Sequence, residues 1–221
     1  MFFKNGLPQK MVLATTLLTF GLGAAEAQTN SPSVQLKSTF YPLTEGSWWK
    51  YKKTVTSYKG EKTTTSYKDE VLPSTSKEAH SAVKFKGIQP IVLKRTSDDS
   101  KENRLIYFTV KDGWISQVGT DACSYSSAMR ILPLDPKPPQ KWTDSGTGKG
   151  ATPDMSFTME FTNKVSLIAQ KNPQYIVRQV EAQKDTYQKS VGLVRSHSKE
   201  MIFQGSPPQI TEVELVAHQI K

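Results

Sequence analysis

The chain has 221 residues, 29 of them Lys or Arg and 20 Asp or Glu, so its formal net charge at pH 7 is +9. Its length suffices for one domain with a substantial core. Because Cys123 is the single cysteine, an intramolecular disulfide is excluded and stability must come from burial. We expect the Cys123 thiol to fill a small buried space.

Residues 1–27 have the pattern of an export signal. Lys4 and Lys10 make a positive start, Met11–Leu22 is apolar, and Ala25-Glu26-Ala27 fits the small-x-small cleavage rule. The apolar run is shorter than the roughly 20 residues that span a bilayer. We therefore predict cleavage after Ala27, no transmembrane anchor in the mature chain, and a secreted or periplasmic location. The residue directly after the cleavage site is Gln28 and not a cysteine, so a bacterial lipid anchor is not expected.

The rest of the chain predicts a flexible lead-in over residues 28–40 and a single β domain over 41–221. Runs of alternating polar and apolar residues, interrupted by turn residues, predict strands and no convincing helix. A sub-division near 133–140 is an alternative, because the prolines of Pro133–Pro139 exclude ladder structure and indicate an extended crossover. The predicted strands are Ser47–Tyr58, Glu61–Leu72, Ala79–Lys86, Ile88–Thr96, Arg104–Lys111, Trp114–Val118, Tyr175–Lys184, Val191–Phe203 and Ile210–Gln219.

Two turns and one loop are predicted from their glycines. Lys59-Gly60 fits a two-residue hairpin loop, and Asp112-Gly113 is the strongest hairpin signal in the chain. The third candidate is Ser-Gly-Thr-Gly-Lys-Gly at residues 145–150. A phosphate-binding loop here would need Gly at position 143 and Ser or Thr at position 150, where the chain has Thr143 and Gly150. We interpret residues 145–150 as a flexible surface loop.

The most regular segment is Met155–Gln170, where seven of the eight odd positions are apolar and seven of the eight even positions are polar. A strand separates these two sets onto opposite faces, whereas a helix would mix them. The segment is either one long strand curling over a core or two shorter strands that meet at Asn163-Lys164. Five residues of its apolar face are candidates for contact with a ligand: Phe157, Met159, Phe161, Val165 and Leu167.

Three stretches in series resemble a family of uncharacterised bacterial secreted proteins and lipoproteins. Tyr41-Pro42-Leu43, with Gly46, Trp48 and Tyr51, resembles the opening of that family. Leu132-Pro133-Leu134, with Pro139 and Trp142, resembles its central Pro-rich element. Residues 191–195, Val-Gly-Leu-Val-Arg, resemble its Gly-x-Gly-Leu-Val-Lys strand, with Ser190 where a Gly is usual and Arg195 where a Lys is usual.

The resemblance implies an all-β exported domain of unassigned function. Members of the family are often lipid-anchored, whereas this chain lacks the cysteine expected directly after the cleavage site. The resemblance implies no catalytic residues. On physical grounds, Trp48 or Trp49 should supply a buried anchor, and Gly192 should mark a bulge or close packing under an aromatic ring.

The sequence offers little support for catalysis. The three histidines, His80, His197 and His218, lack zinc-binding spacing, and no Gly-x-Ser-x-Gly motif occurs. We therefore predict no catalytic residue, no metal site and no cofactor. A secreted hydrolase stays open as a third reading, because four carboxylates could meet in space: Asp112, Asp144, Glu160 and Glu181.

A lysine-rich hairpin near the start of the domain is a candidate surface for anionic partners. Its lysines, interleaved with tyrosines, could contact anionic envelope components, or they could protect an edge strand from pairing with other chains. The six candidates are Lys50, Lys52, Lys53, Lys59, Lys62 and Lys68.

Together these observations predict an all-β protein: an antiparallel meander of about nine or ten strands, forming one strongly curved sheet or two packed sheets. The predicted function is that of an exported, basic, non-catalytic protein of the bacterial envelope that binds an amphiphilic or apolar ligand. The alternative is a structural or interaction module that works through the lysine-rich hairpin. The expected partners are a lipid or an anionic envelope polymer, with no nucleic acid, and the protein is expected to be a monomer.

Overall fold

The structure is a computed structural model, and the predicted export signal and most of the lead-in lie outside its described residues. The described residues are 36–37, 39–81, 90–99, 102–151, 156–202 and 204–221. Their elements are β1 (Trp48–Thr56), β2 (Lys62–Val71), α2 (Lys77–Ser81), β3 (Ile91–Ser97), β4 (Arg104–Lys111), β5 (Trp114–Thr120), β6 (Cys123–Pro133), β7 (Gln140–Ala151), β8 (Ser156–Ala169), β9 (Tyr175–Val180), β10 (Gln183–Gln188), β11 (Gly192–Glu200) and β12 (Gln209–Gln219).

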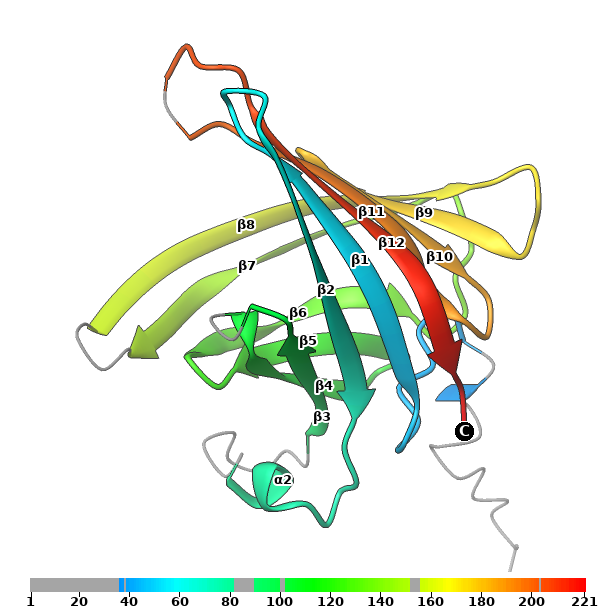
Figure 1. Cartoon of the computed structure of the whole chain (residues 1–221). Coiled ribbons are helices and arrows are strands. Elements are labelled where there is room, and N and C mark those ends of the chain that lie inside the picture. The colour runs from blue at the N-terminus through cyan, green and yellow to red at the C-terminus, as the bar shows by residue number, and fades with distance from the viewer. Residues whose placement is uncertain (1–35, 38, 82–89, 100–101, 152–155, 203) are drawn as a thin grey trace, which may run out of the picture.

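The strands form one closed antiparallel barrel (Figure 1). Each strand pairs with its neighbours in the chain, and β1 pairs with both β2 and β12, which closes the sheet. The predicted all-β antiparallel meander is confirmed. The described residues form twelve strands, so the predicted count of nine or ten is wrong. The sheet curves until it closes, and it does not divide into two packed sheets.

Two of the additional strands are β6 and β7, and the predicted surface loop at residues 145–150 is part of β7. Its glycines pair with bulky residues of β8: Gly146 with Phe161, Gly148 with Met159 and Gly150 with Phe157. A Cβ atom at Gly146 or Gly150 would lie 2.9 Å and 2.3 Å, respectively, from the ring of its partner. Gly148 would meet the Met159 side chain at 3.2 Å. The glycines therefore make room for β8 side chains that lie across β7, a role that single-strand periodicity does not reveal.

Side chains continue the contact between β6 and β7 where their main-chain pairing ends. The two strands pair at Cys123–Tyr125 against Gly148–Gly150. Beyond this ladder, Ser127 Oγ donates to the Ser145 carbonyl at 2.7 Å. Arg130 Nε donates to Asp144 Oδ1, also at 2.7 Å. Cys123 itself is buried, as predicted.

Two further segments differ from their predictions. Residues 79–81 of the predicted strand Ala79–Lys86 belong to the short helix α2, and the rest of that segment lies outside the described residues. The predicted strand Tyr175–Lys184 is divided into β9 and β10 by a tight turn at Glu181, where φ is 32°. The Asp112-Gly113 turn is confirmed, with φ values of 52° and 78° that match a two-residue hairpin.

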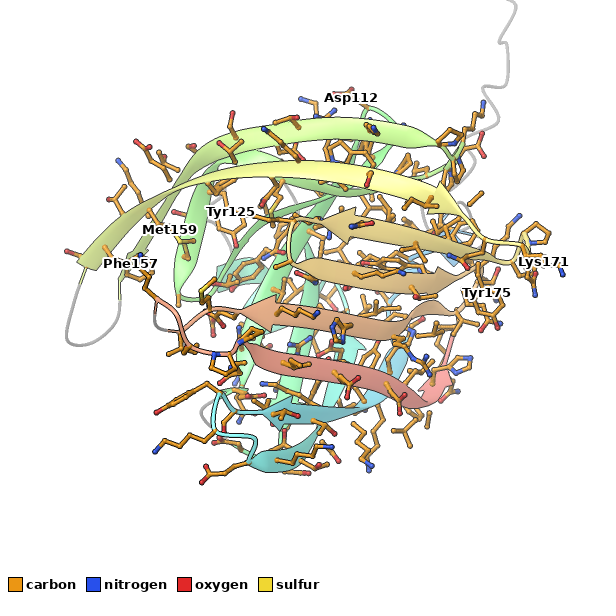
Figure 2. All side chains as sticks on the ribbon, turned by 90° about the horizontal axis from the view of Figure 1, so that it is seen from above. Asp112, Tyr125, Phe157, Met159, Lys171 and Tyr175 are labelled. Carbon is orange, nitrogen blue, oxygen red and sulfur yellow. The ribbon has the colours of Figure 1, made fainter. Side chains whose placement is uncertain are left out.

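β8 is one uninterrupted strand, which settles the choice between one long strand and two. It spans 14 residues and pairs with β7 without a break from Ser156 to Leu167. Figure 2 shows Phe157 and Met159 near one end of β8, and Lys171 and Tyr175 beyond the other end. Those two ends correspond to the two ends of the barrel.

The segment before β1 closes one end of the barrel. Leu36, Phe40 and Leu43 are buried there in the main core cluster. Trp49 is the predicted aromatic anchor, with 1% of its surface exposed, and its Nε1 donates to the Val191 carbonyl. Gly192 packs against the Trp49 ring as predicted. This end of the barrel, where β1 begins and β12 ends, is the closed end, and the opposite end is here called the open end.

We predict that replacing Gly192 with alanine costs more stability than replacing Gly60. Both glycines have positive φ, so each substitution strains the backbone by about 1–2 kcal/mol. Nothing lies within 4 Å of an added Cβ at Gly60, whereas at Gly192 the Cβ would lie 3.2 Å from Trp49 Nε1. Urea denaturation should show a loss of about 1 kcal/mol for Gly60→Ala and of at least about 2 kcal/mol for Gly192→Ala. Equal losses would contradict a role for the tryptophan contact.

Candidate functional site

A cavity of about 590 Å³ occupies the lumen of the barrel. It lies inside the barrel because eleven of the twelve described strands, all but β7, contribute residues to its wall. Its lining includes the exposed Arg104 and the buried Tyr187, so it extends from the protein surface into the interior. The lumen is therefore hollow toward the open end and filled by the core toward the closed end.

Tyr41 forms the floor of this cavity. It belongs to the segment that closes the barrel, and its ring packs edge-on against Phe108 at 5.7 Å and against Tyr187 at 5.9 Å. Burial raises the pKa of the Tyr41 and Tyr187 phenols far above the ordinary value, so both keep their O–H groups at neutral pH. The floor is thus aromatic, with polar hydroxyl groups that can donate hydrogen bonds.

One wall carries a fully formed ion pair between β2 and β3. Arg95 Nε and Nη2 donate to the two carboxylate oxygens of Asp69, each at 2.7 Å. The two residues are cross-strand partners, and Asp69 is 5% exposed. The Arg95 guanidinium also stacks over the Tyr67 ring at 4.1 Å. Its bidentate geometry with Asp69 is the strongest form of this pairing.

The opposite wall carries a second buried pair, between β9 and β10, with incomplete bonding. Arg178 Nη1 donates to Asp185 Oδ2 at 3.3 Å. Asp185 Oδ1 also accepts from Ser196 Oγ at 2.7 Å, and the Gln183 amide contacts both carboxylate oxygens. Arg178 is only 6% exposed, and its Nε has no hydrogen-bond partner within the part of the chain that the structure describes. A buried donor without a partner is rare and costly, so this group needs an explanation.

The charges that line the lumen are predominantly positive. Four cations (Lys53, Arg95, Arg104 and Arg178) and two anions (Glu102 and Asp185) line it. Asp69, bonded to Arg95, brings the anions to three and leaves an excess of one positive charge. Lys53 pairs with Glu102 nearer the open end.

Apolar side chains make up much of the remaining wall. They come from five different strands, so the charged groups face an apolar surface across the lumen. These residues are Ile106, Phe108, Met129, Ile131, Val180, Leu193 and Val213. An apolar pocket with a few converging polar groups is the usual form of a small-molecule binding site.

The five ligand-facing candidates on β8 lie away from this cavity. Val165 and Leu167 are 3% and 1% exposed and belong to the main core cluster. Phe157, Met159 and Phe161 lie over the β7 glycines, and Met159 is 46% exposed. The face of β8 that carries the odd-numbered residues does reach the lumen, but through Asn163, which is the one polar residue of that face. The apolar members thus serve the core and the β7–β8 contact.

The six candidate lysines do not share one surface. Lys50, Lys52, Lys59 and Lys62 are exposed. Lys53 lies on the opposite face of β1 from Lys50 and Lys52. It lines the lumen, where it pairs with Glu102. Lys68 pairs with Glu70 at 2.8 Å and lies over the Trp48 ring. β1 pairs on both sides, whereas β2 pairs with β3 only from Tyr67 onward, so Lys62 lies on the part of the hairpin that keeps a free edge.

The four carboxylates of the hydrolase reading do not converge. Asp112 lies in the β4–β5 turn at the closed end, whereas Glu181 lies in the β9–β10 turn at the open end. Asp144 is held by Arg130, and Glu160 is exposed on β8. In the described part of the chain, no cluster of three His, Cys, Asp or Glu residues could hold a metal ion. Nor is any helix of that part long and apolar enough to cross a membrane.

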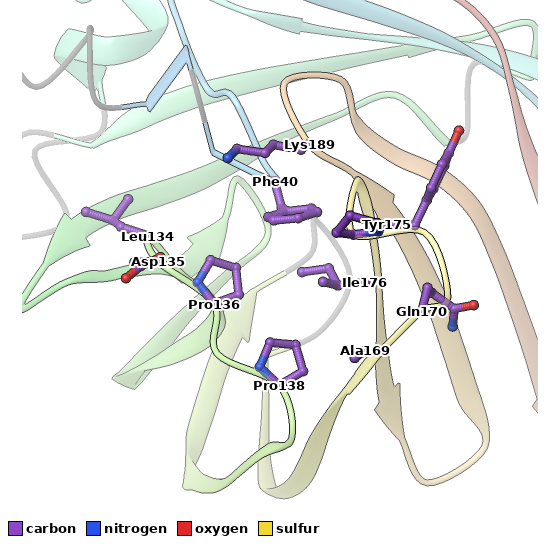
Figure 3. A pocket seen from close by; sticks show the side chains of 11 residues that line it. Phe40, Leu134, Asp135, Pro136, Pro138, Ala169, Gln170, Tyr175, Ile176 and Lys189 are labelled. Atoms are coloured by element: carbon purple, nitrogen blue, oxygen red, sulfur yellow. The ribbon is translucent and has the colours of Figure 1, made fainter.

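A second cavity, of about 460 Å³, lies at the closed end of the barrel (Figure 3). Phe40, Pro136, Pro138 and Ile176 contribute to its walls, between the Pro-rich segment and the start of β9. Its two charged residues, Asp135 and Lys189, are exposed. It therefore offers no buried charge to a ligand, in contrast to the lumen.

Sequence reasoning missed the lumen residues because they are scattered. Arg178 and Asp185 are cross-strand partners in β9 and β10. This pairing can be recognised only once the turn at Glu181 is known. The available signal was a basic residue in an otherwise largely apolar run, Ile176–Val180, with an acidic residue seven positions later. Asp69 and Arg95 are 26 residues apart and offer no comparable signal.

Comparisons with known proteins identify no relative. No family model matches the chain, and no curated protein and no solved structure is significantly similar to it. The family resemblance therefore stays a prediction. Several residues that carry it, including Tyr41, Leu132, Trp142 and Gly192, lie in or near the closed end of the barrel. The site must accordingly be interpreted from its own chemistry.

We predict that removing Arg95 destabilises the protein more than removing Arg178. Arg95→Met takes both donors from the buried Asp69 carboxylate, and breaking such a pair costs about 3–5 kcal/mol. Arg178→Met leaves Asp185 bonded to Ser196 and Gln183, so we expect a loss of about 1–2 kcal/mol. Urea denaturation of both variants measures the difference. If Arg178→Met costs as much as Arg95→Met, the function of Arg178 is structural.

We predict that stability falls at alkaline pH. Burial raises the pKa of four tyrosines, Tyr41, Tyr51, Tyr67 and Tyr187, well above the usual value. In the unfolded chain these phenols ionise near pH 10, so the unfolded state loses protons first. Stability should therefore be unaffected by them below about pH 10 and decrease as the pH rises further.

Phenolate absorbance and circular dichroism, followed together through an alkaline titration, test this expectation. The buried phenols should ionise only as the sheet unfolds. Ionisation of all eight tyrosines with the circular dichroism unchanged would contradict it.

Proposed function

We propose that this protein is an exported, non-catalytic binding protein that holds one amphiphilic ligand in the lumen of its barrel. The observation that carries the proposal is the lumen itself. A cavity of about 590 Å³ falls within the roughly 300–1,000 Å³ of typical ligand pockets. The export part of the proposal rests on the sequence of residues 1–27.

The division of the barrel into a filled end and a hollow end supports this function. The closed end is packed around Trp49, Leu132 and Leu167, which supplies a rigid core. The hollow end combines apolar wall residues with buried charges. A protein without a ligand would gain stability by filling that space, because burial of apolar side chains is favourable. A cavity of this size therefore favours a binding function.

The two other functions that the sequence left open have less support. The lysine-rich hairpin divides its cations between the outer surface and the lumen, which weakens a single anionic contact surface. The carboxylates proposed for a hydrolase lie at opposite ends of the barrel. Neither arrangement has the buried, convergent groups that the lumen has.

Native mass spectrometry of the protein purified from its own host, followed by lipid extraction, tests the proposal on the natural ligand. We expect a discrete amphiphile to be released. A second measurement uses isothermal titration with decanoate and with decan-1-ol, each below its solubility and micelle limits. The absence of a released amphiphile together with no binding of either probe would overturn the proposed function.

We predict that filling the lumen abolishes binding. Val180 lines the cavity and is only partly exposed, so Val180→Trp places an indole in the space that a ligand would occupy. Val216, on β12, is 62% exposed on the outer surface, and Val216→Trp is the matched control. The affinity for whichever probe binds the unmodified protein should fall at least about tenfold for Val180→Trp, by the 1.4 kcal/mol-per-decade relation, and stay unchanged for Val216→Trp. Equal affinities in the two variants would place the site elsewhere.

A further inference from the structure

We propose that the lumen selects ligands that carry one anionic group, and that the guanidinium of Arg178, a residue of the lumen wall, binds this group. The proposal rests on the proposed function and specifies the chemistry of its ligand. The natural ligand would be an amphiphile with a carboxylate or a phosphate ester at one end and an apolar body at the other.

The two buried carboxylates at the lumen already accept hydrogen bonds on both of their oxygens. Both oxygens of Asp69 accept from Arg95. Both oxygens of Asp185 also accept hydrogen bonds, Oδ1 from Ser196 and Gln183, and Oδ2 from Arg178 and Gln183. A ligand that offers donors, such as an amine, would therefore find these carboxylates occupied.

A donor is left over on the same wall. Arg178 Nε lies in a residue that is 94% buried, and in the described chain it has no partner. The hydrogen bond to Asp185 uses the other edge of the guanidinium, through Nη1. A buried guanidinium donor needs an oxygen acceptor, and an oxyanion supplies the strongest one.

Arg95 shows, within the same protein, what such an edge binds. Its Nε and Nη2 hold the two oxygens of the Asp69 carboxylate at 2.7 Å each. Arg178 has the same group in the same kind of wall, but among the described residues its Nε has no acceptor. Because that Nε atom is enclosed, the guanidinium must turn toward the lumen to hold a ligand oxyanion as Arg95 holds Asp69. The guanidinium fork matches carboxylate and phosphate alike.

The charge and the apolar surface of the lumen agree with this assignment. Lining groups, with Asp69, leave one excess positive charge, and because the other three cations are paired it belongs to the exposed Arg104 at the open end. The phenol O–H groups of Tyr41 and Tyr187 line the floor of the same cavity as additional donors. Apolar residues such as Ile131, Leu193 and Val213 offer a surface for the body of the ligand.

The experiment compares probes of equal chain length and different head groups. Isothermal titration of the unmodified protein would use decanoate, decyl phosphate, decan-1-ol and decylammonium. We expect at least one of the two anions to bind at least about tenfold more tightly than the alcohol, and the ammonium to bind most weakly, as expected for a charge-assisted hydrogen bond. The preferred anion distinguishes a carboxylate ligand from a phosphate ester.

Two variants locate the selectivity. Arg178→Met should remove the preference for the anions while leaving the affinity for decan-1-ol unchanged. Arg195→Met is the control, because Arg195 lies on the exposed surface in a pair with Glu214 and should change nothing. Arg178→Lys keeps the charge without the guanidinium fork and should restore part of the preference. Retained binding of decan-1-ol shows that each variant is folded.

The outcomes separate the two proposals. If the alcohol binds as tightly as the anions, the anion assignment is overturned and the binding function stands. The same holds if Arg178→Met and Arg195→Met keep equal preferences for the anions. If none of the four probes binds and no amphiphile co-purifies from the host, the binding function itself is overturned, and the assignment of Arg178 with it.

Discussion

The pairing of β1 with β12 is the interaction on which the rest of the structure depends. It joins the first and last strands of a meander and converts an open sheet into a barrel. Closure satisfies the main-chain groups that edge strands would expose, and it gives every strand one side that faces an enclosed space. Residues far apart in the sequence, such as Asp69 and Asp185, become parts of one lumen for this reason.

Closure by itself leaves a tube with two ends, and the segment before β1 makes those ends different. Tyr41 and Leu43 enter one end, where a Cβ atom added at Gly192 would lie only 3.2 Å from Trp49 Nε1. The other end keeps its space and its charges. The diameter of a barrel increases with the number of its strands, so twelve strands enclose a wide interior. Core side chains and the segment before β1 fill this interior at the closed end only. The lumen is the part that remains unfilled.

Prediction from the sequence succeeded where the evidence was local. The alternation along β8, the hairpin at Asp112-Gly113 and the packing of Gly192 under an aromatic ring depend on neighbouring residues or on backbone conformation. It failed for β7, whose glycines give no alternating pattern, because the side chains that cover them belong to β8. The five residues of β8 that the sequence offered as ligand contacts stay a prediction; in the structure Val165 and Leu167 belong to the core, and Phe157, Met159 and Phe161 lie over the β7 glycines.

The sequence by itself determined the all-β class, the antiparallel meander and the absence of an intramolecular disulfide, because these follow from periodicity, turn residues and a cysteine count. Only the tertiary structure decided that the sheet closes and that one end is hollow. It also decided that Arg178 is buried with an Nε that has no partner among the described residues, while Arg95 holds both oxygens of Asp69. The physical reason is that closure and ion pairing depend on contacts between strands. No single segment of the chain specifies the register of those contacts.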